Sequence, residues 1–189
     1  TAADFAVQYK KFEVLAVLRK YGVTVNYSGD RGKDIVMAIL SEDRDKVLSL
    51  LAEGVDPDTK TKSGKSLLAY AVDYKWPDVV EALIQKGANT QVKDENGWTL
   101  MMTAALENQE EILRAFARAG VQVPYSMDKQ QDLLIAVLWS DQAKATDLLS
   151  QGADVNGRYR YDSPLLSYAV YKKDRAMAEF LLDKGADPN

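Results

Sequence analysis

The 189-residue sequence contains no cysteine and no histidine. Without cysteine the chain can form no disulfide and has no thiol nucleophile, and without histidine it lacks the residue most often used for acid–base relays. The common zinc sites built from cysteine and histidine are excluded for the same reason. These absences remove many enzyme classes, and we expect neither a metal nor a cofactor.

Long apolar runs and an excess of positive charge are also missing. No stretch approaches the roughly 18 consecutive apolar residues of a membrane span, so we expect no membrane insertion. The net charge of −4 and the pI of about 5.0 remove the attraction that drives non-specific binding to nucleic acid. Hydrophobic residues make up 47% of the chain, which is typical of a folded protein. We expect a cytoplasmic protein, with a periplasmic or secreted one as the alternative.

One short pattern recurs six times along the chain. It consists of two bulky apolar residues, two polar ones, a glycine and a small or apolar residue, as in 83–88. Each glycine follows an amphipathic segment, where the C-terminus of a helix needs positive φ. The intervals between successive glycines are 32, 33, 33, 32 and 33 residues, and the glycines are Gly22, Gly54, Gly87, Gly120, Gly152 and Gly185. This regular period predicts a stack of similar helical units.

A second helical segment is predicted to begin twelve residues after each of the first five glycines. A polar residue followed by an apolar face is a helix-start signal. The predicted first residues are Asp34, Ser66, Thr99, Asp132 and Pro164. Each unit is therefore expected to contain a pair of helices.

Several segments resemble the ankyrin-repeat consensus, namely GADVN at 152–156, GADPN at 185–189, GVDPD at 54–58 and DENGWTLMMTAA at 94–105. The resemblance covers the whole chain, although the histidine of the consensus is absent from every unit. It implies an all-α ankyrin-repeat solenoid of stacked helix-turn-helix units with short β-hairpin or loop fingers. We expect one domain over 1–189, with repeat units at about 1–25, 26–57, 58–90, 91–123, 124–155 and 156–189.

Both ends of the sequence fall inside the repeat register, and apolar residues such as Phe5 and Phe180 occur near them. The terminal repeats of a solenoid usually carry a polar outer face. We therefore expect these residues to be part of a longer array or of a larger protein.

The resemblance implies that a partner binds on the concave face, at the fingertips and the exposed side of each first helix. The predicted finger contacts are the residues six, eight, nine and eleven positions after each glycine. The predicted helix contacts are the residues nineteen and twenty positions after each glycine. Aromatic residues dominate interface hot spots, although single rings could instead cover a neighbouring repeat. The aromatic residues at these positions are Tyr9, Tyr74, Trp98, Trp139, Tyr161 and Tyr171. Trp76, before Pro77, is expected to be a structural wedge.

Basic residues gather on two predicted fingers of this acidic chain. They indicate an acidic partner surface or an anion, and a solvated surface without function is the alternative. These residues are Lys60, Lys62, Lys65, Arg158 and Arg160. The full set of candidate partner-binding residues is Tyr9, Lys65, Tyr74, Trp98, Trp139, Arg158, Arg160, Tyr161 and Tyr171.

We expect a monomeric, non-enzymatic module that binds a partner protein or peptide. One alternative is an inhibitor or immunity-type protein that neutralises an enzyme or a toxin, and another is the substrate-targeting domain of a larger enzyme. No phosphate-binding loop and no paired carboxylates stand outside the repeat pattern, and a structural spacer would not need the aromatic cluster. The irregular finger between Gly120 and Asp132, with Trp139 beside it, is predicted to lie near the binding site.

Overall fold

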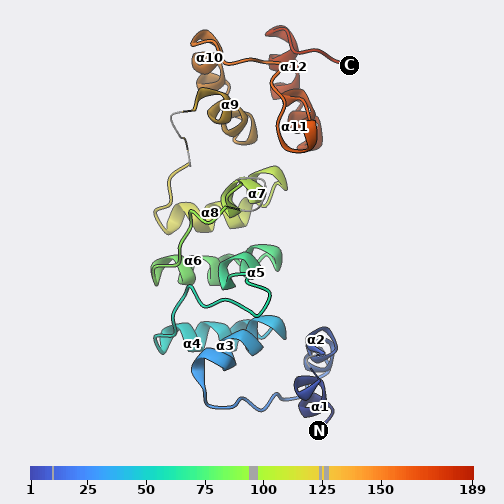
Figure 1. The fold of residues 1–189 in the computed structure, drawn as a ribbon, viewed down its shortest axis with the longest axis vertical. Coiled ribbons are helices and arrows are strands. Elements are labelled where there is room, and N and C mark those ends of the chain that lie inside the picture. Colours follow the sequence, from blue (N-terminus) through green and yellow to red (C-terminus); the bar gives the residue numbers. More distant parts are fainter. Residues whose placement is uncertain (10, 94–97, 124, 126–127) are drawn as a thin grey trace. The chain divides into compact units, whose positions relative to one another are not determined.

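The computed structural model describes residues 1–9, 11–93, 98–123, 125 and 128–189, with the backbone alone for Asp4, Gln8 and Arg160. These residues form twelve α-helices and one short 3-10 helix (Figure 1), which confirms the all-α prediction. The helices are α1 (Ala2–Gln8), α2 (Phe12–Lys20), α3 (Arg31–Leu40), α4 (Arg44–Ala52), α5 (Leu67–Asp73), α6 (Pro77–Gln85), α7 (Leu100–Leu106), α8 (Glu110–Arg118), α9 (Lys129–Leu138), α10 (Gln142–Ser150), η1 (Arg160–Asp162), α11 (Leu165–Tyr171) and α12 (Arg175–Asp183).

The helices follow one another in pairs, and in five of the six pairs the two members pack together, as α3 does with α4 and α9 with α10 (Figure 1). We call the odd-numbered helix of each pair the first helix and the even-numbered one the second. Within each of the two compact units into which the chain divides, first helices also pack on one another, as α3 does on α5 in one unit and α9 on α11 in the other. This is the stacking of helix-turn-helix units that the sequence period predicts.

The glycines at the ends of the second helices have the predicted conformation. All six have positive φ, as at Gly87, where φ is 96°. The predicted starts at Ser66 and Thr99 are confirmed as well, because their side chains accept hydrogen bonds from the backbone N–H groups of Ala69 and Met102. Such caps satisfy amide groups that have no partner inside the helix.

The predicted starts at Asp34 and Asp132 are wrong. In the two 32-residue units the first helices begin one turn earlier, after Asp30 and Asp128, and these residues cap α3 and α9. Among the described residues, the finger before α3 contains no β-bridge. In three other units the finger is closed by a single antiparallel bridge, between Lys60 and Ser66, Lys93 and Thr99, and Arg158 and Pro164.

The six helix pairs are two copies of a three-pair cassette. Each bound of α7 to α12 is 98 residues higher than the corresponding bound of α1 to α6. The glycines obey the same shift, which relates Gly22 to Gly120 and Gly54 to Gly152. Equivalent positions in the two copies can therefore be compared directly.

The chain divides into two compact units close to the boundary between the copies. Unit 1 comprises Thr1–Thr90 and Arg114–Gly120, and unit 2 comprises Gln91–Leu113 and Val121–Asn189. In unit 1 the core contains Ile35 and Leu68. In unit 2 one apolar cluster runs through α7, α9 and α11. The expectation of a single domain remains a prediction.

Candidate protein-binding surface

The first helices end at the residues that sequence counting selected for partner binding. Tyr74 is the C-cap residue of α5, Trp139 is the C-cap residue of α9, and Tyr171 is the last residue of α11. The units that contain α3 and α9 have one residue fewer between their glycine and the C-cap of the first helix than the units that contain α5 and α11. The same count from the glycine therefore reaches a position one residue further along in the units with α3 and α9. By position in the structure, Trp139 is equivalent to Tyr74 and Lys172.

Three of the six predicted aromatic residues are exposed. The exposed fraction is 53% for Tyr9, 65% for Tyr171 and 80% for Tyr161. The Tyr9 ring lies 4.4 Å from the ring of Phe5, which is also exposed. Phe5 and the exposed Val170 were not predicted as surface contacts, since both fit the apolar pattern of a helix. Unit 1 and unit 2 therefore each carry apolar side chains in water along a first helix.

Trp98 does not have the predicted exposure. Its exposed fraction is 3%, and its ring lies 5.8 Å from that of Tyr168 in the core of unit 2, with Met102 and Leu133 in the same cluster. A residue just before a first helix can be covered by the following repeats, and counting from the glycine does not detect this. Trp98 is a core residue and not an exposed contact.

Tyr74 and Trp139 are half-buried. Trp139 packs against the apolar cluster of unit 2. Tyr74 lies between two rings of unit 1, 5.9 Å from Tyr70 and 5.0 Å from Trp76. Trp76 stands directly before α6 and is half-buried against Tyr74, and its role as a structural wedge remains a prediction. These rings are partly accessible to solvent and partly packed within their units.

A hollow of about 420 Å³ lies beside Tyr74 in unit 1. Burial raises the pKa of Tyr74 to about 12, and the carboxylates of Glu42, Asp73 and Glu13 add to this shift. Acidic and aromatic groups therefore meet at the same place. The hollow is lined by Lys11, Phe12, Glu13, Val14, Leu40, Tyr70 and Tyr74.

Unit 2 has a hollow at the equivalent place, with a volume of about 500 Å³. The 98-residue shift relates Phe12, Leu40 and Tyr74 to three of its lining residues. Its chemistry differs, because polar and charged side chains replace most of the aromatic ones. It is lined by Asn108, Glu110, Leu113, Leu138, Trp139, Ser140, Lys172 and Asp174.

The predicted basic contacts differ in their accessibility. Lys65 is half-buried, forms an ion pair with Asp73 and has its ammonium 4.6 Å from the centre of the Tyr70 ring. Arg158 is exposed, and its Nη1 donates a 2.8 Å hydrogen bond to the backbone carbonyl of Asp162. The side chain of Arg160 lies outside the described residues. Lys65 is thus committed within unit 1, whereas Arg158 remains accessible.

Tyr161 is presented by a strained finger. Its φ is 57°, within the short helix η1, and the φ of Asp162 is 58°. A side chain in this left-handed region costs roughly 1–2 kcal/mol. Strained positions of this kind cluster at binding sites and clamps, and here the strain holds a tyrosine out in water.

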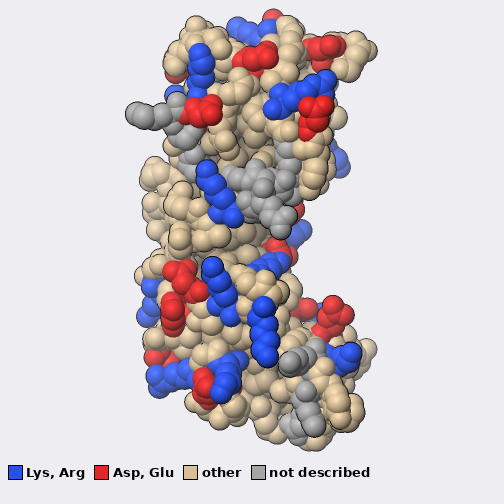
Figure 2. Space-filling view, viewed as in Figure 1, with Lys and Arg blue, Asp and Glu red and all other residues tan. Residues whose placement is uncertain are grey.

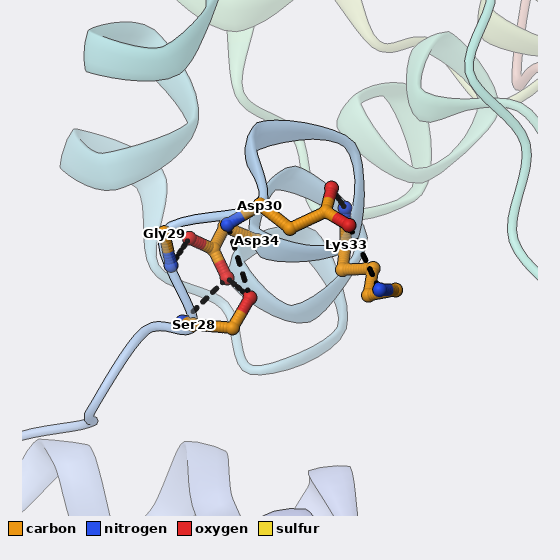
Figure 3. Close-up of polar contacts among 5 residues, drawn as sticks. All are labelled: Ser28, Gly29, Asp30, Lys33 and Asp34. Atoms are coloured by element: carbon orange, nitrogen blue, oxygen red, sulfur yellow. Dashed lines mark hydrogen bonds and ion pairs between the residues drawn. The ribbon is translucent and has the colours of Figure 1, made fainter.

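The finger before α3 is built around a buried carboxylate (Figure 3). Asp34 accepts hydrogen bonds from the backbone N–H groups of Ser28 and Gly29, both at 2.8 Å, and from the hydroxyl of Ser28 at 2.7 Å. Asp30 caps the helix and pairs with Lys33 at 2.8 Å, and this bond lowers the pKa of the Asp30 carboxyl. The side chains of Ser28, Asp30 and Asp34 thus hold the loop through hydrogen bonds within it.

Part of the equivalent finger before α9 lies outside the described residues, namely Pro124, Ser126 and Met127. Tyr125 and Gln131 are described, and they line a hollow of about 180 Å³ with Lys93, Thr99 and Met102. The predicted proximity of this irregular finger to a binding site remains a prediction.

Charges of both signs occur on the face drawn in Figure 2, and neither sign covers it. Over the described residues, no group of three or more aspartates and glutamates is arranged to hold a metal ion. The helices of the described ranges are also too short or too polar to cross a membrane.

Family models for ankyrin repeats match most of the chain. A model of three ankyrin repeats matches residues 35–127, and a single-repeat model matches residues 161–189. A putative ankyrin repeat-containing protein of Treponema pallidum is 29% identical over 113 residues, which are 59% of this chain and 38% of that protein. The potassium channel AKT2/3 of Arabidopsis thaliana is 26% identical over 140 residues, or 73% of this chain and 17% of the channel.

An L-asparaginase of Dirofilaria immitis is 21% identical over 147 residues, which are 77% of this chain and 25% of that enzyme. The chain thus spans 38% or less of the length of these curated relatives. Their names differ too much to suggest one shared activity. Ankyrin repeats are generally non-catalytic modules for protein–protein interaction, and neither family model indicates a catalytic family. On the period, the stacked helix pairs and these matches, the chain belongs to the ankyrin-repeat family.

Proposed function

We propose that this chain binds a partner protein through the C-terminal ends of its first helices and through its fingers, which we call the first-helix surface. In an ankyrin solenoid this surface is the concave face. The observation that carries the proposal is the exposure of Tyr9, Tyr161 and Tyr171 in water. Large rings gain free energy when a partner buries them, and they lose few rotatable bonds in doing so.

The fold supports binding by a preorganised surface. Caps such as Ser66, Thr99 and Asp128 fix the starts of the first helices, and Asp34 fixes one finger. A surface that is ordered before association loses less conformational entropy on binding. The exposed rings are therefore held in place by a scaffold that need not rearrange.

The proposal is tested with single variants of the three exposed tyrosines. The natural partner is captured from an extract of the source organism with the wild-type chain, and its affinity is then measured by calorimetry. We expect Tyr9→Ser, Tyr161→Ser and Tyr171→Ser each to weaken binding, by about tenfold or more for a ring at the centre of the interface.

Tyr21→Ser is the matched control. Tyr21 has an exposed fraction of 86% but follows a second helix, α2, so its loss should leave the affinity unchanged. Equal weakening by Tyr21→Ser, or no weakening by any of the other three variants, contradicts binding at the first-helix surface. Thermal melting of each variant shows whether the fold is retained.

An acidic partner surface is the finer proposal for the finger that carries Arg158. The exposed guanidinium would raise the association rate most at low ionic strength, where screening is weak. The rate of association with the captured partner should therefore fall as salt is added. A rate that does not depend on salt rules out this steering.

The identity of the captured partner also indicates what binding achieves. If the partner is an enzyme or a toxin, its activity with and without the chain distinguishes inhibition from scaffolding or substrate targeting. Each of these outputs uses the same first-helix surface.

A further inference from the structure

In unit 2 a lysine joins the ends of three consecutive first helices. Lys172 follows α11, and its ammonium donates hydrogen bonds to the backbone carbonyls of Leu138 at 2.6 Å and Ala105 at 2.8 Å. Leu138 is the last residue of α9, and Ala105 is in the last turn of α7. Carbonyls at a helix C-terminus have no partner within the helix and carry partial negative charge, so an ammonium is stabilised there.

In unit 1 the same place has acceptors but a different side chain. The 98-residue shift puts Val7, Leu40 and Tyr74 at the positions of Ala105, Leu138 and Lys172. Leu40 ends α3 as Leu138 ends α9, and Tyr74 follows α5 as Lys172 follows α11. Among the described residues, none donates to the Leu40 carbonyl and none is hydrogen-bonded to the Tyr74 phenol. Leu40 and Tyr74 both line the 420 Å³ hollow.

The walls of this hollow combine aromatic rings with charges of both signs. They include the rings of Phe12, Tyr70 and Tyr74 and the side chains of Glu13 and Lys11. Aromatic faces and carboxylates both attract an ammonium group. One lysine of the chain already uses this chemistry, because Lys65 lies 4.6 Å from the centre of the Tyr70 ring. The volume lies within the range of small-ligand sites, roughly 300–1,000 Å³.

We propose that the hollow of unit 1 binds a lysine side chain of the partner protein, whose ammonium group takes the place that Lys172 holds in unit 2. This inference rests on the proposed function, because it specifies one contact of the first-helix surface. The aliphatic part of the lysine would pack on Phe12 and Tyr74, and its ammonium would donate to the Leu40 carbonyl. The Leu40 carbonyl would thereby gain the donor that the second copy supplies from its own chain.

Tyr74→Lys tests the inference inside the protein. The introduced side chain starts from the position of Lys172, so it should donate to the Leu40 carbonyl. Tyr74→Met is the matched control, because it removes the packed ring as Tyr74→Lys does and leaves a stem without an ammonium. We expect Tyr74→Lys to melt about 2–5 °C above Tyr74→Met, and a melting temperature at or below that of Tyr74→Met would mean that the place in unit 1 does not accept an ammonium.

A small probe tests binding from outside. Nα-acetyl-lysine N-methylamide is titrated into the isotope-labelled chain while backbone amide resonances are followed, and the norleucine analogue, which lacks the ammonium, serves as the control ligand. We expect saturable shifts at Glu13, Leu40 and Tyr74 with the lysine probe. In Tyr74→Lys the probe should bind at least about tenfold more weakly, since one charge-assisted hydrogen bond contributes about that factor. Equal shifts with norleucine, or unchanged binding by Tyr74→Lys, overturn the inference.

The captured partner separates this inference from the proposed function. If Tyr161→Ser or Tyr171→Ser weakens partner binding while Tyr74→Lys leaves it unchanged, the lysine site is wrong and the first-helix surface stands. If Tyr74→Lys weakens binding more than Tyr74→Met does and melts above it, the lysine site is supported, and if the two variants behave alike it is wrong. If none of the first-helix variants weakens binding, both proposals are wrong.

Discussion

The phenol of Tyr27 donates a 2.5 Å hydrogen bond to the carboxylate of Asp43, and this bond ties a finger to the start of a second helix. Asp43 also forms a 2.7 Å ion pair with Arg19 and caps α4. The second copy repeats the tyrosine–aspartate contact, since the Tyr125 phenol lies 3.5 Å from Asp141, which caps α10, but Ala117 stands at the position of Arg19. Both tyrosines occur in the 32-residue units, whose fingers have no hairpin bridge among the described residues.

Loss of the Tyr27 hydroxyl should destabilise the protein. We expect Tyr27→Phe to lower the free energy of unfolding by about 1–2 kcal/mol, because a buried carboxylate loses one donor but keeps Arg19. Urea unfolding followed by circular dichroism measures the change. Tyr21→Phe, at an exposed ring, is the control and should change nothing. A Tyr27→Phe variant as stable as this control would mean that the hydrogen bond is not formed in solution.

Alkaline pH should weaken the fold. Burial is the main reason that the pKa of Tyr74 and that of Tyr125 are raised to about 12 from the ordinary value of 10.0. Between pH 10 and pH 12 the unfolded chain loses protons that the folded chain keeps, so the free energy of unfolding falls as pH rises. The stabilisation is fully present below about pH 10.

Urea unfolding at pH 9, 10 and 11 measures this loss, and absorbance at 295 nm reports phenolate formation. A double variant, Tyr74→Phe with Tyr125→Phe, should show a shallower fall than the wild type. If the two fall equally steeply, ionisation of other groups accounts for the alkaline loss of stability.

Backbone strain between paired helices offers a route to a more stable protein. Lys75 follows the C-cap of α5 with φ of 57°, a conformation that glycine adopts without steric cost. We expect Lys75→Gly to raise the free energy of unfolding by about 0.5–1 kcal/mol. Asn108 occupies the same conformation, with φ of 53°, but asparagine tolerates it better. Asn108→Gly should therefore gain less, and an equal gain would show that strain is not the cause.

Lys172 should be important for the stability of unit 2. Replacing it with methionine keeps the apolar stem but removes both donors to the Ala105 and Leu138 carbonyls, so we expect a loss of about 2 kcal/mol. Burial lowers the pKa of Lys172, and desolvation therefore offsets part of this contribution. Amide hydrogen exchange locates the change, which should be largest at the ends of α7, α9 and α11. Stability unchanged from the wild type would contradict the role of this lysine.

Local signals made most of the fold predictable. The positive φ of Gly87 and the caps at Ser66 and Thr99 depend on residues within one turn, and the sequence contains those residues. The early start of α3 was not predicted, because Asp30 and Asp34 are both plausible caps and the loop geometry decides between them. The duplication is also present in the glycine intervals, but those intervals are nearly equal throughout the chain. The constant difference of 98 residues between corresponding helix bounds defines it.

The site was less predictable, because burial depends on neighbouring repeats. Counting from the glycines predicted positions at which Tyr9, Tyr161 and Tyr171 are exposed, but it could not detect that Tyr168 and other residues of unit 2 cover Trp98. The contacts of Lys172 join residues 34 and 67 positions apart. No sequence window contains such a contact, so only the packed helices define the hollows.

Amide hydrogen exchange of the chain with and without its captured partner tests the central claim most directly. We predict that binding slows exchange at the ends of the first helices, around Tyr9 and Tyr171, and in the finger that carries Tyr161. Exchange along the second helices, such as α4 and α10, should stay as it is in the free chain. Protection confined to those second helices would contradict partner binding at the first-helix surface.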